Sequence, residues 1–173
     1  MVKWGWNLAL PPEELSRKEL RGAYVLVLRF PKDIVVKVGS LGNVSFRFGY
    51  YGYVGSGMGR GASSLFGRIR RHLSRSKLIF WHIDYVTSLS EVKVAAVFFT
   101  ESDVRLEHAL SKALKEVGAK SVEGFGASDC DEGCRSHMFF VGSSLEEAFS
   151  TISRAFKKLG IEPKVLSFPK EAW

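Results

Sequence analysis

The stretch Gly49-Tyr50-Tyr51-Gly52-Tyr53-Val54-Gly55-Ser56-Gly57 decides the fold, and two shorter motifs belong with it. Gly22-Ala23-Tyr24 opens the run 22–30, whose β-branched and apolar residues predict a buried strand. Arg68-Ile69-Arg70-Arg71-His72 follows the stretch and is typical of a helix. A tyrosine on each of two strands, with an arginine and a histidine four positions apart on a helix, can converge on one phosphate group.

The helix predicted after this stretch separates apolar from basic side chains. Ser63 or Ser64 caps it, and it reaches about Ser74. At helical spacing one side carries Leu65, Phe66, Ile69 and Leu73. The adjacent arc carries Arg68, Arg71, His72 and Arg75. The helix is therefore expected to pack with one face and to present cations with the other.

The remaining pattern predicts an α+β fold, mainly an antiparallel β-sheet flanked by helices. Strands are expected at 34–38, 44–48, 50–55, 80–87, 92–100, 138–141 and, as an edge strand, 165–168. The loop 39–43 joins the first two of these as a hairpin. Further helices are expected from Asp103 to Val117 and from Ser143 or Ser144 to Leu159.

A length of 173 residues most simply gives one domain. We expect an N-terminal arm over 1–21, with a helix start at Pro11-Pro12, a central domain over 22–142, and a C-terminal helix and tail over 143–173. The tail packs on the same domain in this interpretation. Whether its helix covers the sheet or makes a dimer contact stays open.

The charge favours an anionic partner, with nucleic acid ahead of a membrane. The formal net charge is +7. No Asp or Glu occurs from Ile34 to Ile83, a stretch that holds eight Lys and Arg residues. Such a face can hold a phosphate backbone by Coulomb attraction and counterion release. The expected contacts are Arg60, Arg70, Arg71, Arg75 and Lys77. The alternative is a solvated basic surface that aids solubility.

The sequence predicts a cytoplasmic protein that neither spans nor binds a membrane. No apolar run approaches the ~20 residues of a membrane span, and the N-terminus lacks the apolar segment of a signal peptide. Gln is absent and Asn occurs only at positions 7 and 43, a depletion of thermolabile amides that favours a thermophile source.

These motifs, in this order, resemble the GIY-YIG nuclease superfamily over about residues 22–142. Two longer signatures, Trp81-His82-Ile83-Asp84-Tyr85 and the run 124–130 (GFGASDC), are similar to an uncharacterised prokaryotic branch of it. That branch also occurs fused to endonuclease III-type DNA glycosylases. The resemblance implies a GIY-YIG-like core, here with an inserted hairpin between the two tyrosine strands and an extra C-terminal helix.

The resemblance also implies roles for single residues. Tyr24 and Tyr53 correspond to the motif tyrosines, one of which helps to activate water. Arg68 stabilises the phosphate in the transition state, and His72 is the residue four positions later. Glu107, in Arg105-Leu106-Glu107-His108-Ala109-Leu110, corresponds to the metal ligand, with one Mg²⁺ or Mn²⁺ as cofactor.

Each of these residues also has an ordinary structural interpretation. Tyr24 lies on an apolar strand and could pack in the core. Arg68 and His72 could be surface residues of their helix. Glu107 could be a solvated carboxylate. His82 and Asp84, expected on a strand, could line the edge of the site or make structural hydrogen bonds.

Cys130, Cys134 and His137 form a C-x₃-C-x₂-H cluster. A zinc site normally has four ligands, and with two cysteines in the chain zinc is not the expected cofactor. Reduced thiols, a short disulfide and a metal site remain the alternatives.

The sequence therefore predicts a metal-dependent endonuclease that hydrolyses phosphodiester bonds in DNA, structured or damaged DNA included, with a role in DNA repair. DNA is favoured over RNA. The first alternative is a non-catalytic nucleic-acid-binding domain of the same fold. The second is a basic face that docks an acidic protein, whose identity the sequence does not indicate.

Overall fold

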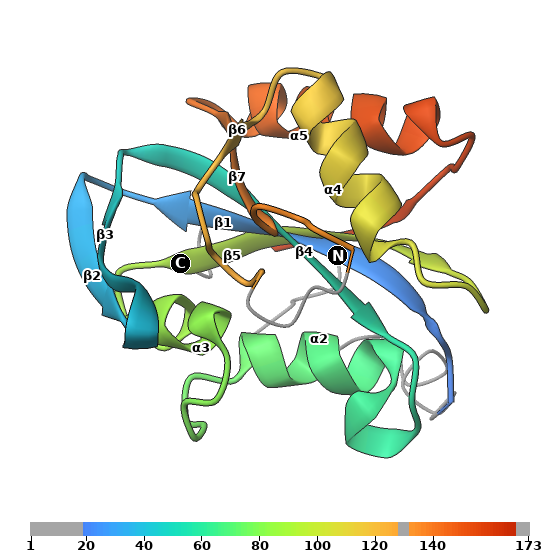
Figure 1. The fold of residues 1–173 in the computed structure, drawn as a ribbon, viewed down its shortest axis with the longest axis horizontal. Helices are drawn as coiled ribbons and strands as arrows, with labels where there is room; N and C mark the ends of the chain where they lie inside the picture. Colours follow the sequence, from blue (N-terminus) through green and yellow to red (C-terminus); the bar gives the residue numbers. More distant parts are fainter. Residues whose placement is uncertain (1–18, 128–131, 169–173) are drawn as a thin grey trace, which may run out of the picture.

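A six-stranded antiparallel sheet forms the centre of the molecule, in the order β6-β7-β4-β1-β5-β8 (Figure 1). The computed structural model describes residues 19–127 and 132–168. The long strands are β1 (Gly22–Phe30), β4 (Gly49–Gly57) and β5 (Lys93–Glu101); the short ones are β6 (Lys120–Ser121), β7 (Met138–Gly142) and β8 (Lys164–Ser167). The predicted α+β fold with a mainly antiparallel sheet is confirmed. The arm predicted over 1–21 lies almost entirely outside the described residues.

Alternation along β1 divides the core into two layers, because successive side chains of a strand point to opposite faces. Ala23, Val25 and Val27 pack in one layer, while Tyr24 and Leu26 pack in the other. Tyr51 and Tyr53 of β4 lie in the layer of Tyr24, as the two-residue period of a strand requires. The two motif tyrosines therefore share one side of the sheet.

Helices cover both faces of the sheet (Figure 1). On the face opposite the tyrosines lie α4 (Glu107–Glu116) and α5 (Leu145–Lys158). On the tyrosine face lie α2 (Leu65–Leu73) and the short α3 (His82–Thr87). The buried residues of α5 pack in the sheet core, so this helix covers the sheet. None of the described helices is long and apolar enough to cross a membrane.

The inserted hairpin forms as expected, with β2 (Ile34–Val38) and β3 (Gly42–Phe46) joined by the 3₁₀ turn η1 (Gly39–Leu41). A second 3₁₀ turn, η2 (Gly61–Ser63), precedes α2. The hairpin packs through aromatic side chains, since the Phe46 ring stacks on Phe30 at 4.6 Å and meets the edge of Tyr51 at 5.3 Å between centroids. The hairpin is thereby anchored to the tyrosine face.

The strand predicted over 80–87 is wrong, because these residues contain helix α3. The cause is Asp84, whose side chain is fully buried. Its Oδ2 accepts hydrogen bonds from the backbone N–H of Phe80 (3.0 Å) and Trp81 (2.9 Å) and from Arg71 Nη2 (2.6 Å). A carboxylate that binds the N–H groups at a helix start stabilises a helical turn, and this outweighs the alternating apolar pattern.

Helix α4 also starts later than predicted. Asp103 is not its cap; the N-cap position is occupied by Leu106, and Glu107 is the first helical residue. The short strand β6 has no counterpart in the sequence prediction, because two residues are too few to show a period.

We expect Asp84→Asn to destabilise the fold by about 2 kcal/mol at neutral pH, the range for hydrogen bonds to a charged group. Burial by itself raises the pKa of Asp84, but the hydrogen bonds from Trp81, Phe80 and Arg71 outweigh it and lower that pKa. The carboxylate therefore contributes stability above its unfolded-state pKa of about 3.9, and this contribution is lost as the pH falls below that value.

Urea unfolding at pH 7 and at pH 3 measures this difference. Wild type and Asp84→Asn should differ less at pH 3 than at pH 7. The exposed Asp103 gives a matched control, because Asp103→Asn should be neutral at both pH values. A gap between wild type and Asp84→Asn that does not narrow at low pH would contradict the assignment.

Candidate active site

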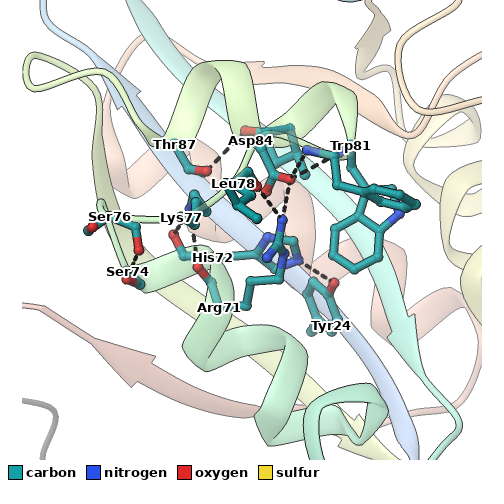
Figure 2. Close-up of polar contacts among 12 residues, drawn as sticks. Tyr24, Arg71, His72, Ser74, Ser76, Lys77, Leu78, Trp81, Asp84 and Thr87 are labelled. Carbon is teal, nitrogen blue, oxygen red and sulfur yellow. Dashed lines mark hydrogen bonds and ion pairs between the residues drawn. The ribbon is translucent and has the colours of Figure 1, made fainter.

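Tyr24 and His72 form a buried pair at the centre of the tyrosine face (Figure 2). Tyr24 Oη lies 2.7 Å from His72 Nε2, and both side chains are at most 2% exposed. Gly55 lies opposite Tyr24 in the β1–β4 register. A Cβ at Gly55 would lie 2.4 Å from Tyr24 Oη. The glycine of the second motif therefore leaves room for the tyrosine of the first.

Burial keeps this pair neutral at physiological pH. Desolvation, and next the neighbouring Tyr53, raise the pKa of Tyr24 well above its ordinary value of 10.0. Desolvation, and next Lys77, lower the pKa of His72 to about 3. The phenol thus keeps its proton and the imidazole stays unprotonated, so a neutral acceptor nitrogen lies beside a phenol.

Tyr53 lies beside the same pair. Its ring centroid is 5.9 Å from that of His72 and 6.2 Å from that of Phe125. The structure thus brings together the two motif tyrosines and the histidine.

Arg68 and Arg71 pack on the same Trp81 ring, at 4.9 and 4.8 Å from its centroid. The two guanidinium groups differ in their polar partners. Arg71 donates to Asp84 Oδ2 (2.6 Å) and to the Leu78 carbonyl (2.8 Å), as Figure 2 shows. Arg68 makes no ion pair with any residue in the described ranges, and its buried Nε has no hydrogen-bond partner there. Of the two arginines on Trp81, Arg68 is therefore the one without a direct carboxylate partner among the described residues.

Glu107 lies at the start of α4, and its side chain is 23% exposed. Its Oε2 accepts from the Ser56 hydroxyl (2.7 Å) and its Oε1 lies 2.9 Å from His137 Nδ1. Burial raises the pKa of Glu107, but the hydrogen bonds from His137 and Ser56 and the charge of Arg68 outweigh it and lower that pKa. Glu107 is therefore an oriented, ionised carboxylate near Arg68, and carboxylate oxygens are ligands for a hard cation that keeps most of its waters.

The basic residues expected to contact nucleic acid divide into two groups. Arg60, Arg70 and Arg75 are exposed. Arg71 is paired with Asp84, and Lys77 Nζ donates to the carbonyls of Arg71 and His72 at 3.1 Å each, where it caps the end of α2. Burial lowers the pKa of Lys77 to about 8. These last two residues have a structural role in addition to any surface role.

Sequence reasoning missed three residues that complete the site: Trp81 as the platform for Arg68, Ser56 as a donor to Glu107, and His108. His108 Nδ1 lies 2.7 Å from Cys134 Sγ, and these two residues and His137 have ligand atoms within 4.8 Å of one another.

His82 makes a structural hydrogen bond, since its Nδ1 accepts from Gly126 N (3.1 Å). The predicted Cys130 lies outside the described residues.

Comparison with known proteins identifies a family. Residues 23–161 match the model of a family described as Domain of unknown function DUF123. No curated protein and no solved structure matches the chain.

The low pKa of His72 predicts that its imidazole does not titrate between pH 5 and 8. In a proton–carbon NMR titration, the ring signal that disappears in His72→Gln should keep its chemical shift over this range. Stability should also fall as the pH drops below about 6.5, because protonating this buried ring costs free energy that the unfolded chain does not pay. A midpoint near 6.5 for this signal would show that the ring is solvated.

Proposed function

We propose that the chain, which belongs to the DUF123 family, is a metal-dependent endonuclease that hydrolyses phosphodiester bonds in DNA. The observation that carries the proposal is the guanidinium of Arg68, which makes no direct ion pair with any described residue and lies near the tyrosine–histidine pair and the carboxylate of Glu107. A phosphodiesterase needs these groups: a cation for the phosphoryl oxygens, a proton acceptor and an oxygen ligand for a divalent ion.

Arg68 supports a phosphate partner on energetic grounds. Its guanidinium is partly buried and makes no direct ion pair among the described residues, and an incoming phosphate would give its buried Nε a charge-assisted hydrogen bond. Trp81 holds the guanidinium in place by cation–π contact. The neighbouring Arg71 cannot substitute, because Asp84 already neutralises it.

The neutral Tyr24–His72 pair supports a role in proton transfer. Tyr24 can take a proton from an attacking water only if it passes its own proton to His72 Nε2, 2.7 Å away. The low pKa of His72 makes it a weak base when no anion lies beside it. The negative charge of a bound phosphate raises the pKa of a nearby imidazole, so the relay would operate when substrate is present. Tyr53 would position the water beside this pair.

Glu107 would hold the divalent ion, Mg²⁺ or Mn²⁺. When bound, the ion would supply positive charge to the phosphate and to the leaving oxygen. The hydrogen bonds from Ser56 and His137 orient the carboxylate for this task and keep it ionised.

An exposed apolar segment beside the basic helix supports a substrate with unpaired bases. The Leu78 and Phe80 side chains are 87% and 78% exposed, and the Phe80 ring lies 5.5 Å from that of Trp81. Aromatic side chains stack on unpaired bases while cations hold the backbone. The resemblance to a branch that occurs fused to DNA glycosylases favours DNA over RNA as the substrate. If that substrate is cellular DNA, the protein works in the cytoplasm.

Cleavage of labelled substrates in Mg²⁺ or Mn²⁺ tests the proposal. The panel includes single-stranded, duplex, flap, abasic and RNA molecules. We expect divalent-ion-dependent products from wild type. Arg68→Ala should lower the rate by at least about 100-fold, the effect of removing one donor to a developing oxyanion. Glu107→Gln should abolish the response to the divalent ion.

Matched controls lie on the same scaffold. Glu116→Gln, at the other end of α4, and Arg154→Ala, an exposed position on α5, should leave the rate unchanged. Salt-sensitive binding without cleavage by any variant would replace the nuclease with a non-catalytic nucleic-acid-binding domain. Absence of both binding and cleavage would reject the proposal.

A separate prediction concerns Phe80. Phe80→Ala should weaken binding to single-stranded and flap DNA by about 1–3 kcal/mol, the value of one stacked base, and should affect duplex binding less. Fluorescence anisotropy measures both affinities. Phe48, a half-exposed aromatic residue after β3, provides the control: Phe48→Ala should have no effect. An equal loss for single-stranded and duplex DNA would contradict stacking.

A further inference from the structure

A second cluster of polar side chains lies beside Glu107 and differs from it in chemistry. His108 of α4 and Cys134 and His137 of the segment before β7 each offer one ligand atom, and these three atoms lie within 4.8 Å of one another. Two nitrogens and one sulfur are a donor set that suits Zn²⁺, whereas Mg²⁺ and Mn²⁺ prefer oxygen. We propose that His108, Cys134 and His137 bind a Zn²⁺ ion.

The three ligand atoms are close enough to share one ion after a small outward movement of His108 or Cys134. Zinc bonds to nitrogen and sulfur of about 2.0–2.3 Å, arranged as a tetrahedron, place neighbouring ligand atoms about 3.5 Å apart. His108 Nδ1 lies 2.7 Å from Cys134 Sγ. The His108 and His137 rings meet at 79° with centroids 6.2 Å apart. The three side chains therefore converge on a common point from two elements that are distant in sequence.

Both histidines also have the outer partners that zinc ligands need. A zinc-binding imidazole usually directs its second nitrogen to a carboxylate or carbonyl, which fixes the ring and the tautomer. His137 Nδ1 lies 2.9 Å from Glu107 Oε1, and His108 Nε2 lies 3.5 Å from Glu132 Oε2. The remaining ring nitrogens, Nε2 of His137 and Nδ1 of His108, are then the ones available to a metal ion. Two carboxylate–histidine pairs around one thiol indicate a zinc site more strongly than the three ligand atoms alone.

The backbone around His137 suits a fixed ligand. His137 N donates to the Phe125 carbonyl (2.8 Å), and Val54 N donates to the His137 carbonyl (2.8 Å). The His137 side chain is 6% exposed, whereas that of His108 is 26% exposed, so an ion can enter from the side of α4. Three protein ligands leave a position for a fourth ligand or for water.

The ion would tie the segment before β7 to the start of α4. It would thereby hold His137 against Glu107 and keep that carboxylate in place. The binding of zinc itself does not depend on the proposed nuclease activity.

Metal analysis of the purified full chain tests the proposal. The chain is expressed in zinc-supplemented medium without a polyhistidine tag, and zinc is measured by plasma mass spectrometry after desalting. We expect about one zinc per chain for wild type, and at least a tenfold lower content for Cys134→Ser and for His108→Ala. Zinc-free wild type that also fails to take zinc from a chromogenic chelator would overturn the proposal.

Two controls separate this site from the rest of the molecule. His82→Gln removes a histidine outside the cluster, and Arg68→Ala removes the proposed phosphate ligand; both should keep one zinc per chain. Arg68→Ala that has lost cleavage but keeps zinc would show that the two sites are independent. Loss of zinc in His82→Gln to the same degree as in Cys134→Ser would contradict the assigned ligands.

X-ray absorption at the zinc edge needs no variant and so does not depend on whether variants fold. We expect a wild-type shell that contains sulfur at about 2.3 Å and nitrogen at about 2.0–2.1 Å. A shell without sulfur would overturn the assignment of Cys134.

Discussion

The antiparallel register of β1 and β4 is the constraint on which the site depends, because it places Tyr24 across from Gly55. The ring of Tyr24 occupies the space that a side chain at position 55 would need. Its hydroxyl then reaches His72, and this contact fixes how α2 lies on the sheet. A shift of one residue in the register would move every side chain of β1 to the opposite face and would separate the tyrosine from the helix that carries Arg68.

Two arginines of α2 show how the same residue type can have different partners on one helix. Arg71 is paired with a fully buried carboxylate and thereby joins α2 to α3. Arg68 packs on the same indole ring but has no such partner among the described residues. The buried Asp84 makes the difference, since it holds one guanidinium and leaves the other available. The distribution of charge on this face therefore depends on a carboxylate that is itself fully buried.

Much of the fold could be predicted from the sequence, because the long strands and amphipathic helices have clear periods. The run 22–30 is almost entirely apolar, as a strand buried on both faces requires, and Ser144 with Glu147 marks the start of α5. The segment 80–87 could not be predicted correctly, since its helix depends on Asp84 binding Arg71 from another element. The resemblance of the motifs singled out Tyr24, Tyr53, Arg68, His72 and Glu107 as candidate site residues. The approach of His108 to Cys134 has no local signal, because only the folded chain brings α4 to the segment before β7.

The hairpin β2–β3 separates the two motif tyrosines in sequence but not in space. It leaves the sheet at the end where Phe30 pairs with Gly49, whereas Tyr24 pairs with Gly55 near the opposite end. The length of the connection between β1 and β4 therefore does not determine the geometry around Tyr24. Doubling the length of such a connection costs only about 0.6 kcal/mol in closure entropy. The tip of the hairpin at η1 nevertheless folds back onto the tyrosine face, where Leu41 packs against the core that contains Tyr24 and Tyr53. Residues added along the hairpin would therefore leave the register of the two tyrosine strands unchanged, whereas a change at Leu41 would be felt in the core beside them.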